Sequence, residues 1–143
     1  MYKRQGIDYH FVSRERFEEY ISKDLLLEHA VVYTNYYGSL REEVEKVIES
    51  GKSVLLVVDV QGALTIKEKF SSAIEFFIKA PSISVLKKRL IMRGTDAMDV
   101  IEKRMVTAKE ELKLENKFTY VVVNDNLQKA IQEVKSIIRK SLV

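Results

Sequence analysis

"SVLLVVDV", residues 53–60, is an apolar run that only Asp59 interrupts between its first and last residues. Such a run is typical of a strand buried on both faces of a parallel sheet, because a strand with one wet face alternates apolar and polar residues. Two further segments have the same character: AIEFFIKA at 73–80 and YVVVND at 120–125. We therefore expect three buried strands.

Helical patterns alternate with these runs. The spacing of apolar residues predicts helices at 40–50, 61–70, 82–94, about 96–117 and 126–142. Strands that alternate with helices predict an α/β fold, in which helices cover both faces of a parallel sheet.

The N-terminal part of the chain breaks this alternation and predicts a small antiparallel lobe. Its alternating aromatic residues at 8–12 predict a short strand, after which Ser13 can cap a helix at 14–24. The stretch LLLEHAVVYTNYYGS at 25–39 is rich in β-branched and aromatic residues. It predicts antiparallel strands with a turn at Gly38.

The composition is that of a globular domain, with 143 residues of which 46% are hydrophobic and 31% charged, and without Cys. The missing thiols exclude disulfides, thiolate metal sites and a Cys nucleophile. No apolar run approaches the roughly 20 residues needed to span a bilayer, and no secretory segment is visible. We expect one domain in the cytoplasm, with no membrane contact and an oligomeric state that the sequence leaves open.

The charge is slightly positive, with 24 Lys and Arg against 21 Asp and Glu. Three interpretations are open: a nucleic-acid surface, an ordinary solvated surface, or a few arginines that converge on a phosphorylated ligand. The positive residues are spread among acidic ones, which favours the ordinary surface over nucleic-acid binding.

Polar residues end two of the predicted strands. Ligands of open parallel sheets bind beyond the carboxyl ends of the strands, where Asp59, Asn124 and Asp125 would lie. A carboxylate at such a tip is costly to bury unless it faces a cleft or a partner. The alternatives are that Asp59 caps the next helix and that Asn124 and Asp125 form a turn.

The predicted lobe carries a second set of candidates. Glu28 lies in an apolar stretch, and its carboxylate could accept from the paired N–H groups of a guanine edge. The hydroxyls of Tyr9, Tyr36, Tyr37 and Ser39 could bind a phosphate or a carbonyl oxygen, although aromatic residues of a small sheet more often serve in packing.

Three arginines form the last set. Arg89 and Arg93 lie four residues apart on one predicted helical face, and Arg104 lies on the next helix. Together they could stabilise a transferring phosphate, or they could form a solvated face paired with nearby Glu. His10 and His29 show no metal-ligand spacing, so no protein metal site is expected.

The chain resembles the guanylate kinase family through segments that occur in this order: GIDYHFVS, LLLEHA, NYYGS, VVDVQGA, RLIMRGTD, KRM and VVVND. The resemblance implies a P-loop-type nucleoside monophosphate kinase fold. Its parts would be a GMP-binding lobe at 6–40, a core at 41–85 and 116–143, and a helical lid at 86–115. It also implies transfer of the ATP γ-phosphoryl group to GMP, which gives GDP and ADP in purine nucleotide metabolism.

The resemblance implies a role for each GMP-site candidate. Tyr9 and Tyr37 would bind the GMP phosphate, Glu28 and Ser39 would read the guanine edge, and Asp59 would face the GMP.

It likewise implies the ATP contacts. Arg89 and Arg93 would bind the ATP phosphates as lid arginines, Arg104 would reach the phosphates from the next helix, and Asn124 would lie near the adenine. The partners would be GMP and ATP with Mg²⁺.

Two departures stand out. Val57 occupies a position that is usually acidic in the family, and the chain has no GxxxxGK[ST] phosphate loop. That loop holds the ATP phosphates and Mg²⁺, so we expect most Mg²⁺ ligands in a missing N-terminal part and little or no activity from this chain alone. The missing strand would lie between 53–60 and 73–80, and its loss would expose two strand edges.

Two alternatives stay open. Residues 1–5, MYKRQ, are interpreted as a library adapter fused to a truncated reading frame, against a natural N-terminus that happens to have this sequence. The chain could also be a catalytically dead binding module for phosphorylated peptides. The acceptor and lid residues are all present, which favours the enzyme.

Overall fold

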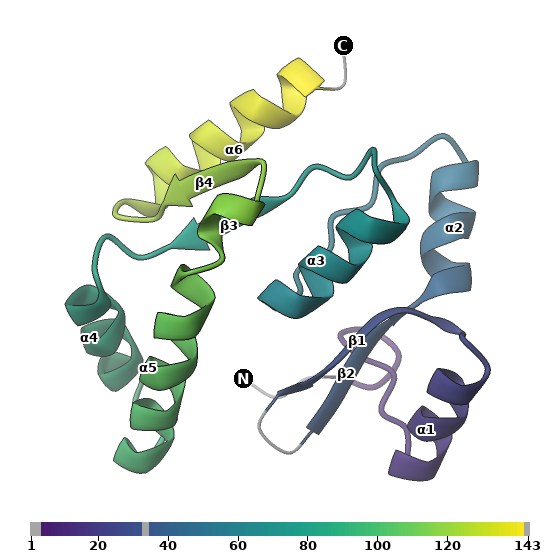
Figure 1. The fold of residues 1–143 in the computed structure, drawn as a ribbon, viewed down its shortest axis with the longest axis horizontal. Helices are drawn as coiled ribbons and strands as arrows, with labels where there is room; N and C mark the ends of the chain where they lie inside the picture. Colours follow the sequence, from purple (N-terminus) through teal and green to yellow (C-terminus); the bar gives the residue numbers. More distant parts are fainter. Residues whose placement is uncertain (1–3, 33–34, 142–143) are drawn as a thin grey trace. The chain divides into compact units, whose positions relative to one another are not determined.

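The structure is a computed structural model that describes residues 4–32 and 35–141, and it divides into two compact units, residues 1–70 and 71–143 (Figure 1). The elements of the first unit are α1 (Arg14–Ser22), β1 (Leu26–Val32), β2 (Asn35–Leu40), α2 (Arg41–Glu49) and α3 (Val60–Lys69). Those of the second are β3 (Phe76–Lys79), α4 (Ile83–Arg93), α5 (Met98–Leu112), the 3₁₀ helix η1 (Glu115–Lys117), β4 (Tyr120–Val123) and α6 (Leu127–Ser141).

Helix α1 begins as the sequence predicts. Ser13 has an extended backbone, and its Oγ accepts a hydrogen bond of 3.2 Å from the Arg16 backbone N–H. On the buried face of the helix, the ring of Phe17 lies 5.1 Å from that of Tyr36 on β2. The helix is thereby anchored to the hairpin that follows it.

Strands β1 and β2 form the predicted antiparallel pair, in a register that places Glu28 opposite Ser39. The predicted turn at Gly38 is wrong, because Gly38 lies within β2 and pairs with His29. A Cβ at Gly38 would lie 2.9 Å from the Glu28 carbonyl oxygen and 3.1 Å from Phe17 Cζ. This glycine therefore permits close packing.

Two predicted strands are absent from the structure. Residues 8–12 form no strand, and the backbone at 4–9 instead turns around the carbonyl of Arg4, with a single bridge between Gln5 and Tyr9. Residues 53–59 belong to no helix or strand. Their side chains include Leu55 and Val57, which are 77% and 94% exposed. No strand in the described part of the chain pairs with residues 53–59, so their apolar run is not buried in a sheet there.

The second unit confirms the predicted parallel pairing. Strand β3 pairs with β4, with Phe77 beside Val121 and Ile78 beside Val122. The pair is less covered than the sequence predicts, because Ile78 is 51% exposed although Val122 is fully buried. Helix α6 packs against β4, as Figure 1 shows.

Helices α4 and α5 lie side by side (Figure 1) and share a small apolar cluster formed by Leu90, Ile101 and Met105. Ser82 caps α4, and Gly94 ends it in the left-handed conformation. The long helix predicted at 96–117 is shorter in the structure, because α5 ends at Leu112 and η1 follows.

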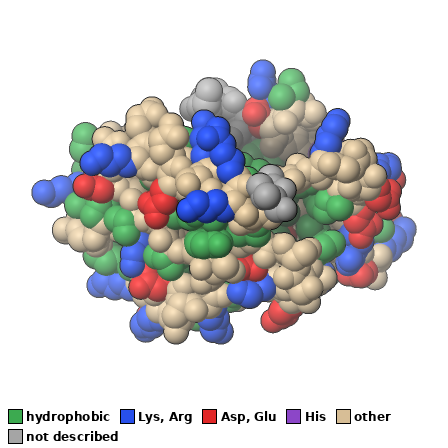
Figure 2. Space-filling model, turned by 90° about the horizontal axis from the view of Figure 1, so that it is seen from above, with side chains coloured by type: hydrophobic (Ala, Val, Ile, Leu, Met, Phe, Trp, Pro, Cys, Tyr) green, Lys and Arg blue, Asp and Glu red, His purple; other side chains and the backbone are tan. Residues whose placement is uncertain are grey.

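The surface has no single charged region on the face drawn in Figure 2, where Lys and Arg side chains are separated by acidic, polar and hydrophobic ones. Among the residues that the structure describes, no helix combines the length and the apolar character needed to cross a membrane.

Candidate functional site

A cavity of about 300 Å³ in the first unit brings together residues from four stretches of the chain: the segment before α1, strand β1, strand β2 and the segment before α3. It is lined by Tyr9, Glu28, Ala30, Tyr37, Gly38, Ser39, Val57, Val58 and Asp59. All the residues for which the family resemblance implies a contact with GMP are among them. The residues of this predicted set therefore lie around one cavity in the structure.

Glu28 is the buried acid of this cavity. It is 5% exposed, and the Ser39 hydroxyl donates a hydrogen bond of 2.7 Å to its Oε1. The antiparallel register explains the contact, because it places the two residues opposite each other. Because this hydrogen bond uses only one lone pair of the buried carboxylate, its other lone pairs can accept further donors.

Asp59 has both roles that the sequence leaves open. It is the N-cap of α3, and its Oδ1 accepts a hydrogen bond of 2.7 Å from the Gly62 backbone N–H. Its side chain also lines the cavity. The cap fixes the carboxylate, and the position of the cap places it in the cavity.

The aromatic residues divide into two groups. The rings of Tyr9 and Tyr37 meet edge to face at 5.9 Å, and both residues line the cavity at 43% and 41% exposure. Tyr36 instead packs on Phe17, and its hydroxyl accepts a hydrogen bond of 3.3 Å from Arg14 Nη2. Tyr36 does not line the cavity.

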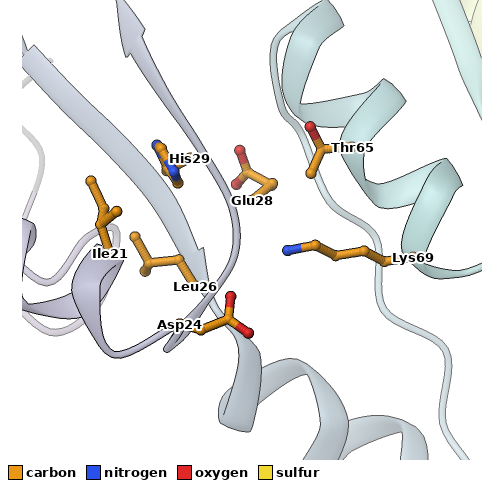
Figure 3. A pocket seen from close by; sticks show the side chains of 7 residues that line it. All are labelled: Ile21, Asp24, Leu26, Glu28, His29, Thr65 and Lys69. Atoms are coloured by element: carbon orange, nitrogen blue, oxygen red, sulfur yellow. The ribbon is translucent and has the colours of Figure 1, made fainter.

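A second cavity, of about 230 Å³, also has Glu28 in its wall (Figure 3). Lys69 of α3 points toward β1 in this view, where its Nζ donates a hydrogen bond of 2.8 Å to the Leu27 carbonyl oxygen. This bond ties α3 to the strand that carries Glu28. No pattern in the sequence indicates this contact, since Lys69 resembles an ordinary exposed residue at a helix end.

Arg89 is held within the second unit. Its Nη1 donates a hydrogen bond of 2.6 Å to the carbonyl oxygen of Asn124, and its Nη2 donates one of 3.0 Å to that of Asp125. The contact with Asn124 is thus made to its backbone oxygen and not to its side chain. In this arrangement the guanidinium group stabilises the turn between β4 and α6.

The other two arginines have different surroundings. Arg104 Nη1 forms an ion pair of 3.1 Å with Asp96 Oδ2, whose side chain is only 15% exposed. Arg93 is exposed on the last turn of α4. Arg89 and Arg104 are thus held by different partners, and the ion pair of Arg104 is with Asp96, for which the sequence pattern indicates no role.

Metal ligands are not clustered in the described residues. In 4–32 and 35–141, no group of three or more His, Cys, Asp or Glu side chains is placed to hold a metal ion. Asp59 and Glu28 share a cavity, but each has a partner within the protein.

Comparison with known proteins gives one consistent result. Residues 1–141 match the family described as guanylate kinase. A guanylate kinase of Clostridium perfringens is 41% identical over 133 residues, which are 93% of this chain and 62% of that protein. A guanylate kinase of Bacillus anthracis is 44% identical, with 93% and 65% covered. The chain thus spans somewhat less than two thirds of these relatives.

The fold agrees with the sequence comparison. The crystal structure of guanylate kinase from Anaplasma phagocytophilum matches 96% of this chain and 67% of its own, with a TM-score of 0.81 and 31% identity. The predicted P-loop-type nucleoside monophosphate kinase fold is confirmed by this match. The chain belongs to the guanylate kinase family.

Proposed function

We propose that this chain provides the GMP-binding site of a guanylate kinase, which transfers the γ-phosphoryl group of MgATP to GMP. One observation carries the proposal: buried Glu28, hydrogen-bonded by Ser39, faces a cavity also lined by Tyr9, Tyr37 and Asp59. A buried acid at a cavity wall is costly to desolvate, and a ligand that brings donors to it compensates that cost.

The guanine edge is the proposed partner of Glu28. Guanine presents a ring N–H and an exocyclic amino group side by side, and a carboxylate can accept from both. Adenine lacks that ring N–H, so it would leave one acceptor unpaired. Ser39 orients the carboxylate by donating to Oε1. Selectivity for GMP over AMP would follow from this pair.

The phosphate of GMP is the proposed partner of the two tyrosines. Tyr9 and Tyr37 lie edge to face on the cavity wall and are partly exposed, so their hydroxyls can donate to phosphate oxygens. Asp59 would face the nucleotide from the start of α3, in the position that its cap hydrogen bond fixes.

The ATP contacts belong to the second unit in this proposal. Arg89, Arg93 and Arg104 would bind phosphate oxygens, and Asn124 would lie near the adenine. Arg89 must then exchange the carbonyl oxygens of Asn124 and Asp125 for phosphate oxygens. Positive donors placed at the transferring group would stabilise its developing charge.

Mg²⁺ would arrive with ATP and neutralise phosphate charge. The described residues contain no cluster that fits as its ligand set, so no residue is assigned to the ion. The 143 residues also contain no GxxxxGK[ST] pattern. We therefore propose that they bind GMP and that, on their own, they do not catalyse the transfer.

The remaining assignments follow the family. Residues 6–40 would form the GMP lobe, 86–115 the lid, and 41–85 with 116–143 the core. The place of action would be purine nucleotide metabolism in the cytoplasm. GMP and ATP would be the partners, without nucleic acid.

Isothermal titration tests the proposal. GMP and AMP are titrated into the 143-residue chain, and a coupled assay measures GDP formation with MgATP. We expect binding of GMP, much weaker binding of AMP, and no turnover. Equal affinity for the two nucleotides would refute the guanine role of Glu28, and robust GDP formation would refute the statement on catalysis.

A further inference from the structure

We propose that Gly62 is a positioning residue for Glu28: its missing side chain leaves the space that the Glu28 carboxylate occupies. Gly62 is buried in the first turn of α3. This positioning role rests on the proposed function for its consequence, which is selectivity for GMP.

The geometry at Gly62 is close. A Cβ built on this residue would lie 2.6 Å from Glu28 Oε2 and 3.3 Å from Glu28 Cδ. Both distances are shorter than ordinary van der Waals contact, so a methyl group and the present carboxylate cannot coexist. The other carboxylate oxygen, Oε1, accepts a hydrogen bond from the Ser39 hydroxyl. The carboxylate is thus enclosed between the Ser39 hydroxyl and the Gly62 backbone.

The backbone itself does not require glycine at this position. The glycines with positive φ are Gly6, Gly51 and Gly94, and Gly62 is not among them. Alanine is also a better helix former than glycine. The requirement for glycine therefore comes from Glu28, with a lesser contribution from Asp59 Oδ1 at 3.1 Å.

Gly38 provides the matched contrast. A Cβ there would also meet Glu28, but at the backbone carbonyl oxygen, 2.9 Å away, and it would also meet Phe17 Cζ at 3.1 Å. A strand backbone paired in a hairpin cannot move aside as a side chain can. Gly38→Ala should therefore weaken the fold, whereas Gly62→Ala should mainly displace a carboxylate.

The test compares Gly62→Ala and Gly38→Ala with the unchanged chain. For Gly62→Ala we expect GMP affinity to fall about tenfold, AMP affinity to stay unchanged and the melting temperature not to fall. For Gly38→Ala we expect a lower melting temperature. Wild-type GMP affinity in Gly62→Ala would overturn the inference.

A double-mutant cycle shows whether Gly62 acts through Glu28. In a Glu28→Gln background the paired acceptor is already lost, so adding Gly62→Ala should leave the GMP-to-AMP preference unchanged. A further loss of that preference would contradict the inference. If Gly62→Ala lowers the melting temperature, adding Glu28→Ala removes the clashing oxygen and should restore it, and no restoration would contradict the inference.

A readout without nucleotide separates this inference from the proposed function. The ¹³C resonance of the Glu28 carboxyl and a crystal structure of Gly62→Ala report the position of the carboxylate directly. If the unchanged chain binds no GMP but the carboxylate moves in the variant, the positioning role stands and the proposed function fails. A carboxylate that keeps its position and its Ser39 hydrogen bond overturns the inference.

Discussion

The residues proposed for ligand binding have different surroundings in the two units of the molecule. In residues 4–70, the predicted set lines one cavity, and the Glu28 carboxylate is bonded by Ser39 while it faces that cavity. In residues 71–141, Arg89 donates hydrogen bonds to two backbone carbonyl oxygens, and Arg104 forms an ion pair with Asp96. The residues proposed for GMP thus lie around one cavity, whereas two of the arginines proposed for the ATP phosphates form hydrogen bonds or ion pairs with groups of their own unit.

The difference follows from how each set is positioned. A hairpin register and a helix cap fix Glu28, Ser39 and Asp59, and both are local structures. The arginines are long side chains on helices, and a guanidinium group bonds whichever oxygen is near. We infer that the first site can bind its ligand as it stands and that the second requires Arg89 to exchange partners.

Substitutions in the core of each unit should have the largest effect, and they test whether GMP binding depends on the first unit alone. Leu27 and Ile101 are 1% and 2% exposed in the first and second units. Replacing either by Ala should lower the free energy of unfolding by about 2–5 kcal/mol, because a cavity remains. Calorimetry measures the loss, and titration at a temperature where both variants are folded measures GMP affinity.

Only Leu27→Ala should weaken GMP binding, since Leu27 is the neighbour of Glu28 on β1. An equal loss of GMP affinity in folded Ile101→Ala would break the comparison, because it would make the site depend on both units.

The next largest effect is expected at the acid itself. Glu28→Gln keeps the shape but replaces one acceptor by a donor, which should cost about 1–3 kcal/mol of GMP binding, or roughly a tenfold to hundredfold loss. Glu49→Gln, at the exposed end of α2, is the matched control and should change nothing. Unchanged GMP affinity in Glu28→Gln would show that the carboxylate does not contact the base.

Arg89 tests the other side of the comparison. Arg89→Ala removes both donors from the carbonyls of Asn124 and Asp125, and should lower the free energy of unfolding by about 1–2 kcal/mol. GMP affinity should stay at the wild-type value, because Arg89 lies in the unit without the GMP cavity. Arg93→Ala, which removes an exposed side chain of the same helix, is the control and should leave the free energy of unfolding unchanged. Equal stability of Arg89→Ala and the wild type would refute the structural role.

The smallest expected effect is a pH dependence of stability that arises from Glu19 on α1. Hydrogen bonds from Lys23 and then Arg16 hold the pKa of Glu19 below its ordinary value. A carboxyl pKa that is lower in the folded state adds stability above the unfolded pKa, and this contribution is lost as the pH falls through the folded pKa. Exposed pairs contribute little, so the effect is small.

Glu19→Gln should therefore lower the melting temperature slightly at neutral pH, and the difference from wild type should disappear in acid. GMP affinity should not change, because Glu19 does not line the cavity. A difference that grows as the pH falls would contradict this sign.

The sequence predicts those parts of the fold and of the candidate site whose determinants are local. Ser13 caps α1, residues 25–39 form antiparallel strands, and 120–125 supply a strand parallel to β3. Part of the GMP set shares one cavity for the same reason, because Glu28, Tyr37 and Ser39 lie on one hairpin, whereas Tyr9 and Asp59 come from outside it.

The errors lie where a partner decides the outcome. The apolar run at 53–60 has a strand composition, yet an apolar strand forms only beside another strand, and the described residues pair none with it. Gly38 resembles a turn residue, but the Glu28 carbonyl and the Phe17 ring explain it. Asp96 and Gly62 were missed because their partners, Arg104 and Glu28, are contacts of the folded chain.

The most direct test of the central claim is a paired titration of GMP and AMP into the 143-residue chain. The account predicts that GMP binds to a single site with clear preference over AMP, and that Glu28→Gln removes the preference. Absence of GMP binding by a folded chain, or equal binding of the two nucleotides, would contradict the claim that the cavity around Glu28 is an assembled guanine site.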